Sequence, residues 1–247
     1  MKNVGKKILN TFWDMLFPPR CLGCKKWDVL LCKECGNSIL ATPARQCLYC
    51  FNPIQKNSRH FLLCDKCLLE QEFCQIFSFG EYSGLLKELI HNFKYEFMEE
   101  LHRPLGDFAE QLFAKVFLTN NKLEKIQDLV VLVPVPLHAS RLAWRGFNQA
   151  ELISQRLVQK YNLSCLNLLE RKLPTRVQMK LDREERWQNV KNCFGWNKKY
   201  NYANFINKII ILVDDITTTG ATLESCFWLL RQNKIENAVG FVLAHGG

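Results

Sequence analysis

The chain has 247 residues, of which 48% are hydrophobic and 23% are charged, as in an ordinary globular protein with one or two domains. It contains no run of 18 apolar residues, which argues against a transmembrane helix, and no small-residue cleavage site follows its apolar N-terminal stretch, which argues against a signal peptide. The formal net charge of +9 indicates a basic surface, and we expect a cytoplasmic protein.

Residues 1–20 form a leader in which basic residues precede a short apolar stretch that Asp14 interrupts. We interpret this leader as a helix that packs on its own protein. A helix that docks on a partner or lies on a membrane surface is the alternative, because both would bury the same apolar side chains.

Cysteine dominates the next segment, residues 21–75, where nine of the twelve cysteines of the chain occur. Eight of them form four Cys-x-x-Cys pairs, a pattern that indicates metal binding in a reducing compartment. A tetrahedral Zn²⁺ takes four soft ligands, and each pair supplies two. We therefore predict two structural zinc sites, whose ligands are Cys21, Cys24, Cys32, Cys35, Cys47, Cys50, Cys64 and Cys67.

The four pairs can share two zinc ions in more than one way. Binding of the first pair with the second, and of the third with the fourth, closes the shortest loops, while an interleaved arrangement stays open. Redox chemistry is the weaker interpretation, because it does not require four copies. Two bound Zn²⁺ and eight thiolates lower the net charge to about +5. Cys74, Cys165, Cys193 and Cys226 lack such spacing and are expected to be ordinary thiols.

From residue 76 the pattern becomes that of an α/β domain. Residues 76–82 alternate like a half-buried strand, and a helical pattern follows from Leu85 to Phe97. We interpret residues 76–102 as a hood over the remaining domain. His91 within it is expected to be a surface histidine.

A second strand, rich in valine, begins at Val130 and ends at two prolines, Pro134 and Pro136. Arg141 and Arg145 follow it, and Asn148 begins a further helix. Arginines beyond the carboxyl end of a parallel strand suit a diphosphate, since the planar guanidinium matches its oxygens. Two solvated arginines are the alternative.

Residues 170–208 contain ten Lys or Arg against four Asp or Glu, and we interpret them as a basic flap, with a solvated surface as the alternative. Trp144, Trp187 and Trp196 lie among basic residues. Tryptophans in such surroundings suit base stacking in single-stranded nucleic acid, although core tryptophans are the commoner explanation.

The most informative stretch is residues 209–223, where an apolar run typical of a buried parallel strand ends at Asp214 and Asp215. A loop of small, mostly hydroxylated residues then opens a helix, an arrangement that offers N–H groups to a phosphate. The acid pair suits vicinal hydroxyls or a metal ion, so the combination suits a phosphorylated sugar. A Walker B strand is the rival interpretation, but the chain has no P-loop motif. A buried strand with an acidic, threonine-rich turn is the alternative without function.

This stretch closely resembles the 5-phosphoribosyl-1-pyrophosphate (PRPP) loop of type I phosphoribosyltransferases. From Cys21 onward the chain resembles the ComF/GntX family, in which a double zinc ribbon precedes a type I phosphoribosyltransferase domain, here residues 76–247. The shared motifs are Val133 to His138, Arg145 to Gln149, Phe93 to Tyr95, and the spaced set Gln178, Leu181, Arg186, Asn189, Val190 and Phe194. Asn192 and Cys193 depart from the family pattern without altering the loop assignment.

The resemblance implies a role for each motif. The acid pair would hold the ribose 2′- and 3′-hydroxyls and the loop the 5-phosphate, so the PRPP-binding set is Asp214, Asp215, Thr217, Thr218, Thr219, Gly220, Ala221 and Thr222. The pyrophosphate-binding set is Pro136, Leu137, His138, Arg141, Arg145 and Lys94. Residues 170–195 would be the flexible catalytic loop with Arg183 and Arg186 as its catalytic cations, and Mg²⁺ would accompany PRPP.

The family's best-known members support natural transformation, so the resemblance implies action on incoming single-stranded DNA, with competence proteins such as a ComF-type helicase as partners. An enzyme would displace pyrophosphate from C1 of PRPP, although no residue stands out as its general base. A non-catalytic PRPP sensor or DNA-binding protein, or a nucleotide-salvage phosphoribosyltransferase, is the alternative.

Overall fold

The computed structural model describes residues 18–40, 76–96, 98–118, 127–173, 193–218 and 220–246. Residues 1–17 of the expected leader helix, two of the four cysteine pairs and residues 174–192 of the basic flap lie outside these ranges. Within them, no helix has both the length and the apolar character needed to cross a membrane.

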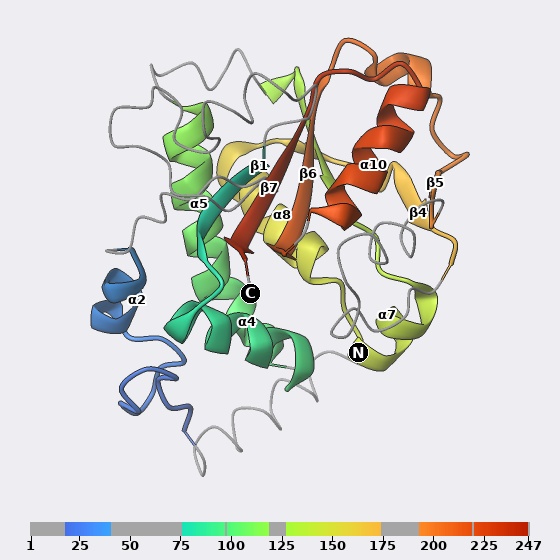
Figure 1. The fold of residues 1–247 in the computed structure, drawn as a ribbon. Helices are drawn as coiled ribbons and strands as arrows, with labels where there is room; N and C mark the ends of the chain where they lie inside the picture. Colours follow the sequence, from blue (N-terminus) through green and yellow to red (C-terminus); the bar gives the residue numbers. More distant parts are fainter. Residues whose placement is uncertain are drawn as a thin grey trace, which may run out of the picture.

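Five strands form one sheet in the order β1–β7–β6–β2–β3, and every neighbouring pair is parallel. β6 lies at its centre, and its residues 210–213 are fully buried, which confirms the buried parallel strand expected from the apolar run. The strands, shown in Figure 1, are β1 (Ile76–Glu81), β2 (Val130–Pro134), β3 (Ser164–Cys165), β6 (Ile209–Thr217) and β7 (Ala238–His245).

Helices cover both faces of this sheet, as predicted for the α/β class (Figure 1). α4 (Gly84–Tyr95), α5 (His102–Phe117) and α8 (Gln149–Tyr161) pack on the face that carries Ile211 and Val213. α10 (Ala221–Gln232) packs on the other face, where Leu212 points. Successive strand residues thus enter different core layers, as the two-residue period requires.

Several short elements were not expected from the sequence. α7 (Ala139–Arg145) follows β2 after a four-residue segment, and η1 (Glu99–Leu101) and η3 (Tyr202–Phe205) are single turns of 3₁₀ helix. β4 (Leu169–Arg171) and β5 (Phe194–Trp196) pair as an antiparallel ribbon. This ribbon joins the two ends of the expected flexible loop, 170–195, whose interior lies outside the described residues.

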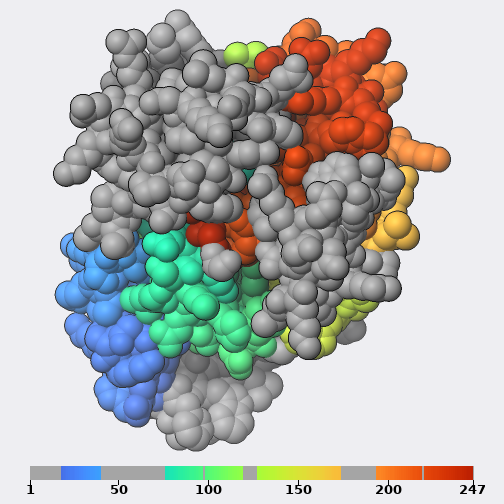
Figure 2. Space-filling model, viewed as in Figure 1, coloured from blue at the N-terminus to red at the C-terminus, as the bar shows by residue number. Residues whose placement is uncertain are grey.

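The N-terminal segment, residues 18–40 with helix α2 (Lys33–Leu40), lies against the hood helix α4 (Figure 2). Its half-buried side chains Leu22, Leu30, Leu31 and Ile39 pack on the same core cluster as α4. Gly23 permits the approach, because a Cβ at this position would lie 2.9 Å from a methyl carbon of Leu85. The described part of the cysteine-rich segment is therefore joined to the hood by apolar contacts.

Candidate functional site

The candidate site lies at the edge where the parallel strands end. Pro134, the last residue of β2, is in register with Val213 of β6, and β6 continues to Thr217. The segment that follows β2 therefore emerges beside the part of β6 that carries Asp214 and Asp215. Helix α4 crosses below this edge and α7 flanks it, as Figure 1 shows. The acidic stretch, the arginine segment and the hood, which are far apart in the sequence, thus meet where ligands of such sheets bind.

The two carboxylates occupy opposite faces of β6. Asp215 continues the side of Ile211 and Val213, toward α4, and only 5% of its surface is exposed. Asp214 is half-buried and continues the side of Leu212, toward α10. An Asp214 carboxylate oxygen accepts a hydrogen bond of 2.8 Å from the amide of Asp215.

Lys94, a basic residue of the hood, forms an ion pair with Asp215, with 2.7 Å between Nζ and Oδ1. Both side chains are largely buried, with 13% and 7% of their surfaces exposed. The resemblance implies that Lys94 binds pyrophosphate, and this stays a prediction; in the ligand-free structure Lys94 pairs with Asp215. The two neighbouring carboxylates repel each other, so this repulsion alone predicts that replacing them with Asn does not lower stability. Replacing Asp215 has a second effect, because it leaves the buried charge of Lys94 unpaired.

Burial of Asp214 makes its charged form costly and raises the pKa of its carboxyl to about 7. The neighbouring charge of Asp215 adds to this increase, and Lys94 opposes it. Asp214 therefore changes its charge near neutral pH.

The loop after β6 has the features of a phosphate site. Gly220 adopts a left-handed conformation with φ of 78°, which favours glycine, and helix α10 begins at the next residue. The residue before this helix, Gly220, has no side chain that could cap it, and the N–H groups at the start of a helix are suited to bind an anion. Thr217 and Ala221 are buried, Thr218 and Thr222 are half-buried, and Thr219 lies outside the described residues.

On the β2 side, the segment Pro136–Leu137–His138 leads into α7. The ring nitrogen Nδ1 of His138 accepts a hydrogen bond from the amide of Ser140 at 3.3 Å and so caps this helix. Asn148 fixes the start of the segment, because its side-chain amide donates to the carbonyl of Val135 at 3.1 Å.

The two arginines of this segment differ in burial. Arg141 is half-buried, whereas Arg145 is 8% exposed and donates a hydrogen bond of 2.6 Å to Gln149. Burial lowers the pKa of Arg145, and the charge of Asp215 opposes this effect. Its Nε atom is buried and has no hydrogen-bond partner among the described residues. A buried guanidinium with an N–H donor that lacks a partner among the described residues is suited to bind an anionic ligand.

Two residues of the site were missed as site residues by the sequence reasoning. Asn148 was recognised only as a helix start, although it also holds the β2 loop. Arg171 was counted only as one flap cation, but it is close enough to Asp214 for their charges to interact. Arg171 lies in a segment rich in basic residues, which is a pattern typical of an exposed surface, so the sequence did not indicate that its side chain is buried. Arg183 and Arg186, the predicted catalytic cations, lie outside the described residues and stay predictions.

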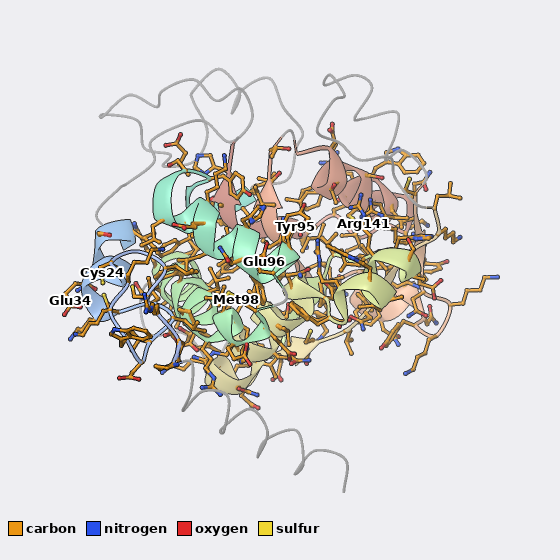
Figure 3. The ribbon with its side chains drawn as sticks, turned by 90° about the horizontal axis from the view of Figure 1, so that it is seen from below. Cys24, Glu34, Tyr95, Glu96, Met98 and Arg141 are labelled. Carbon is orange, nitrogen blue, oxygen red and sulfur yellow. The ribbon has the colours of Figure 1, made fainter. Side chains whose placement is uncertain are left out.

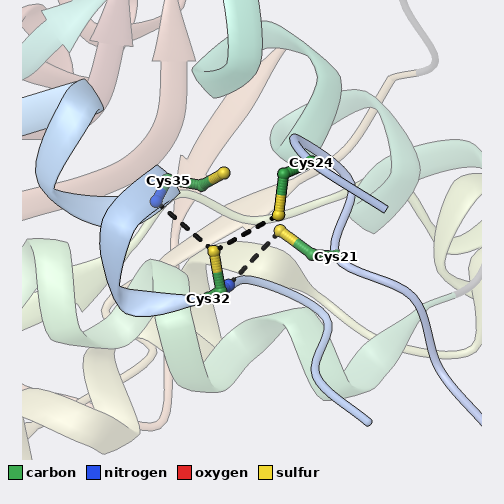
Figure 4. A group of neighbouring side chains, drawn as sticks. All are labelled: Cys21, Cys24, Cys32 and Cys35. Carbon is green, nitrogen blue, oxygen red and sulfur yellow. Dashed lines mark hydrogen bonds between the residues drawn. The ribbon is translucent and has the colours of Figure 1, made fainter. Parts of the chain in front are cut away.

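A separate cluster of four cysteines lies in the N-terminal segment. The sulfur atoms of Cys21, Cys24, Cys32 and Cys35 all lie within 4.8 Å of one another (Figure 4). Zn–S bonds of about 2.3 Å would place tetrahedral ligand sulfurs about 3.8 Å apart, so the four residues fit a zinc ion. The first Cys-x-x-Cys pair thus meets the second. Cys47, Cys50, Cys64 and Cys67 lie outside the described residues.

Local hydrogen bonds prepare this cluster for metal. Burial favours the neutral thiol of Cys21, but backbone N–H groups, that of Cys32 foremost, outweigh burial and lower its pKa to about 6. The amide of Cys32 lies 3.3 Å from the Cys21 sulfur, and the amide of Cys35 lies 3.5 Å from the Cys32 sulfur. Such contacts stabilise the thiolate form of Cys21, whereas burial and the neighbouring side chains raise the pKa of Cys32 and of Cys35 in the metal-free cluster.

Comparison with known proteins decides the family. No protein-family model matches the chain. Competence protein F of Haemophilus influenzae is 31% identical to it over 208 residues, which cover 83% of this chain and 86% of that protein. The chain belongs to the ComF family.

Other relatives of this ComF-family chain carry related names. Competence protein ComFC of Bacillus subtilis is 27% identical over 235 residues, covering 91% of this chain and 88% of that protein. DNA utilization protein YhgH of Salmonella typhimurium is 28% identical over 218 residues, covering 86% of this chain and 88% of that protein. The similarity extends over most of the length of each of these ComF-family relatives.

Proposed function

We propose that this ComF-family protein binds PRPP together with Mg²⁺ at the carboxyl edge of β6 and β2 and thereby supports DNA uptake. One observation carries the proposal. The central strand β6 carries an acid pair near its carboxyl end, and the start of α10, preceded by Gly220, follows it after one short loop. Carboxylates that can accept hydrogen bonds from hydroxyl groups would thus lie next to N–H groups that can bind a phosphate, as a phosphorylated sugar requires.

Each part of the ligand has a counterpart in this arrangement. Asp214 and Asp215 would accept hydrogen bonds from the ribose hydroxyls, and the loop up to Thr222 would bind the 5-phosphate through backbone N–H groups. Arg145, with its spare buried donor, and Arg141 would face the pyrophosphate. Carboxylate oxygens also suit Mg²⁺, which when bound would neutralise charge on the departing pyrophosphate.

The role in DNA uptake rests on the relatives, whose names refer to competence and DNA utilization. In this proposal the protein acts with incoming single-stranded DNA in the cytoplasm, beside competence proteins such as a ComF-type helicase. A reaction would transfer the phosphoribosyl group to an acceptor, with Arg183 and Arg186 stabilising the leaving group. Release of pyrophosphate from PRPP in the presence of DNA or a nucleobase would distinguish this enzyme from a PRPP sensor.

The experiment that tests the site is a thermal-shift titration with Mg²⁺ and PRPP, followed by calorimetry. Wild-type protein should melt higher with the ligand. In the variant Asp214→Asn/Asp215→Asn, the affinity should fall by about two orders of magnitude, since each charged hydrogen bond is worth about 1.5–3 kcal/mol.

The control variant is Asp28→Asn/Asp128→Asn, which removes the same charge at two exposed positions. It should bind PRPP like the wild type. Each variant is compared with its own ligand-free melting temperature, because Asp215→Asn also breaks the ion pair to Lys94. If wild-type protein shows neither a shift nor a calorimetric signal, the proposed PRPP site is wrong.

A further inference from the structure

Three exposed rings form a row beside the proposed PRPP site, and we call His91, Tyr95 and Trp144 the aromatic row. Ring centroids are 4.9 Å apart between His91 and Tyr95, and 6.3 Å apart between Tyr95 and Trp144. The first two rings lie on α4 and the third on α7, so the fold brings them together from separate parts of the chain. Tyr95 and Trp144 are 44% and 55% exposed.

The row is fixed from below by a buried arginine. The Arg145 guanidinium lies 5.5 Å from the Tyr95 ring centroid and 6.0 Å from that of Trp144. Arg145 itself is 8% exposed and is held by Gln149. Because the cation approaches from the protein side, it orients the two rings while leaving much of each ring exposed to solvent.

Core packing does not account for this exposure. Trp196 shows what a packed tryptophan looks like here, because it is half-buried against Phe205 and donates its indole N–H to the carbonyl of Tyr200 at 2.7 Å. The expectation of a core tryptophan thus holds for Trp196 and fails for Trp144. An exposed aromatic row next to a ligand site suggests a stacking partner.

Charges around the row indicate the kind of partner. In the view of Figure 3, Tyr95 lies between Glu96 on one side and Arg141 on the other. Arg141 is also near enough to Arg145 for their charges to interact. A polyanion would therefore be attracted on the α7 side and repelled at Glu96, so its bases can meet the rings while its phosphates meet Arg141.

We propose that the aromatic row stacks the bases of single-stranded nucleic acid and so presents the strand to the PRPP site. Planar bases match the rings, and the tolerance of stacking for any base suits DNA of arbitrary sequence. A duplex would not fit, because its bases are already stacked on each other. The inference rests on the proposed function, since it names the residues through which that function would engage DNA.

The test measures binding of a fluorescent oligothymidylate of about 20 nucleotides by anisotropy, at two salt concentrations. An abasic oligomer of equal length keeps the phosphates and lacks the bases. Wild-type protein should bind oligothymidylate at least about tenfold more tightly than the abasic strand, about 1.4 kcal/mol, and the ratio should persist at the higher salt because stacking is not screened.

Variants then assign the effect to the row. Trp144→Leu and Tyr95→Leu should each weaken oligothymidylate binding by about tenfold, whereas Trp144→Phe and Tyr95→Phe should retain most of it. The matched controls are Trp228→Leu and Tyr202→Leu, whose rings are similarly exposed at 48% and 45% but lie outside the row. These controls should bind like the wild type.

The outcomes separate this inference from the proposed function. Three outcomes would each overturn the proposed role of the aromatic row. They are equal binding of the abasic strand, unchanged binding in the Leu variants, and no binding of oligothymidylate by the wild type. If the Mg²⁺ and PRPP melting shift persists in those cases, the PRPP proposal stands alone. Base-dependent binding through the row without any PRPP shift would support the inference and refute the PRPP site.

Discussion

At the scale of single residues, Asp214 is an acid placed where ionisation is costly. Burial is the main reason that its pKa rises to about 7, and the charge of Asp215 adds to it. The folded protein therefore holds this proton more tightly than the unfolded chain does. Between the usual pKa of an aspartate and pH 7, the folded state binds more protons, so stability contributed by this group falls as the pH rises.

We expect ligand-free wild-type protein to lose stability between pH 6 and pH 8 relative to Asp214→Asn, which cannot ionise. Above pH 8 the two proteins should change in parallel. Chemical denaturation at a series of pH values measures the difference, and Asp128→Asn, at an exposed position, should follow the wild type. Parallel curves for wild type and Asp214→Asn from pH 6 to pH 8 would mean that this carboxyl is ionised throughout.

Much of the candidate site could be predicted from local sequence, since β6 carries both carboxylates and the loop after it is the proposed phosphate-binding loop. The ion-pair partner of Asp215 could not be predicted in this way. Lys94 precedes it by more than a hundred residues, and only the position of α4 below the sheet edge brings the two charges together. The burial of Arg171 could not be predicted for a similar reason, because Phe194, whose ring its guanidinium contacts, belongs to another strand.

At the scale of elements, the contact between the N-terminal segment and the hood depends on Gly23. A Cβ there would lie 2.7 Å from the Cys35 sulfur and 2.9 Å from Leu85, closer than real Cβ contacts. We expect Gly23→Ala to displace one of them, lowering stability by about 1–3 kcal/mol and reducing bound zinc.

The matched control is Gly36→Ala in helix α2. Its Cβ would meet only Leu31, at an ordinary distance of 3.7 Å, and alanine favours helix. Denaturant titration and metal analysis of both variants check the prediction. Equal behaviour of the two would show that the segment is free to shift away from α4.

The long elements were predictable and the short ones were not. Continuous apolar runs identified β2 and β6, because burial on both faces leaves a clear pattern. α7 and the β4–β5 ribbon span too few residues to show any period. They form because neighbouring structure completes them, as when Asn148 holds the loop before α7.

At the scale of the whole molecule, zinc should act as part of the core. We expect two zinc ions per chain by elemental analysis, and about one in Cys24→Ser/Cys35→Ser, which destroys the cluster seen in the structure. Removal of zinc by a chelator should lower the melting temperature of the entire protein, since Leu22 and Leu30 pack on the common core.

Cys165→Ser provides the comparison, because this half-buried thiol lies outside the cluster and burial raises its pKa to about 11. That variant should keep both ions. A wild-type content near one would restrict zinc to the four described cysteines and leave the other two pairs without a metal. A content well below one would contradict zinc binding altogether.

The strand order has a consequence for how the chain is made. β1 has a single neighbour in the sheet, β7, which is also one of the two neighbours of β6. When a nascent chain has left the ribosome only as far as β6, β7 is not yet available, so β1 has no strand to pair with and one edge of β6 is unpaired. Lys94 follows β1 and Asp215 lies on β6, so the position of β7 between these two strands is still empty at that stage. Their meeting, and with it the site, waits for the emergence of residues 238–245.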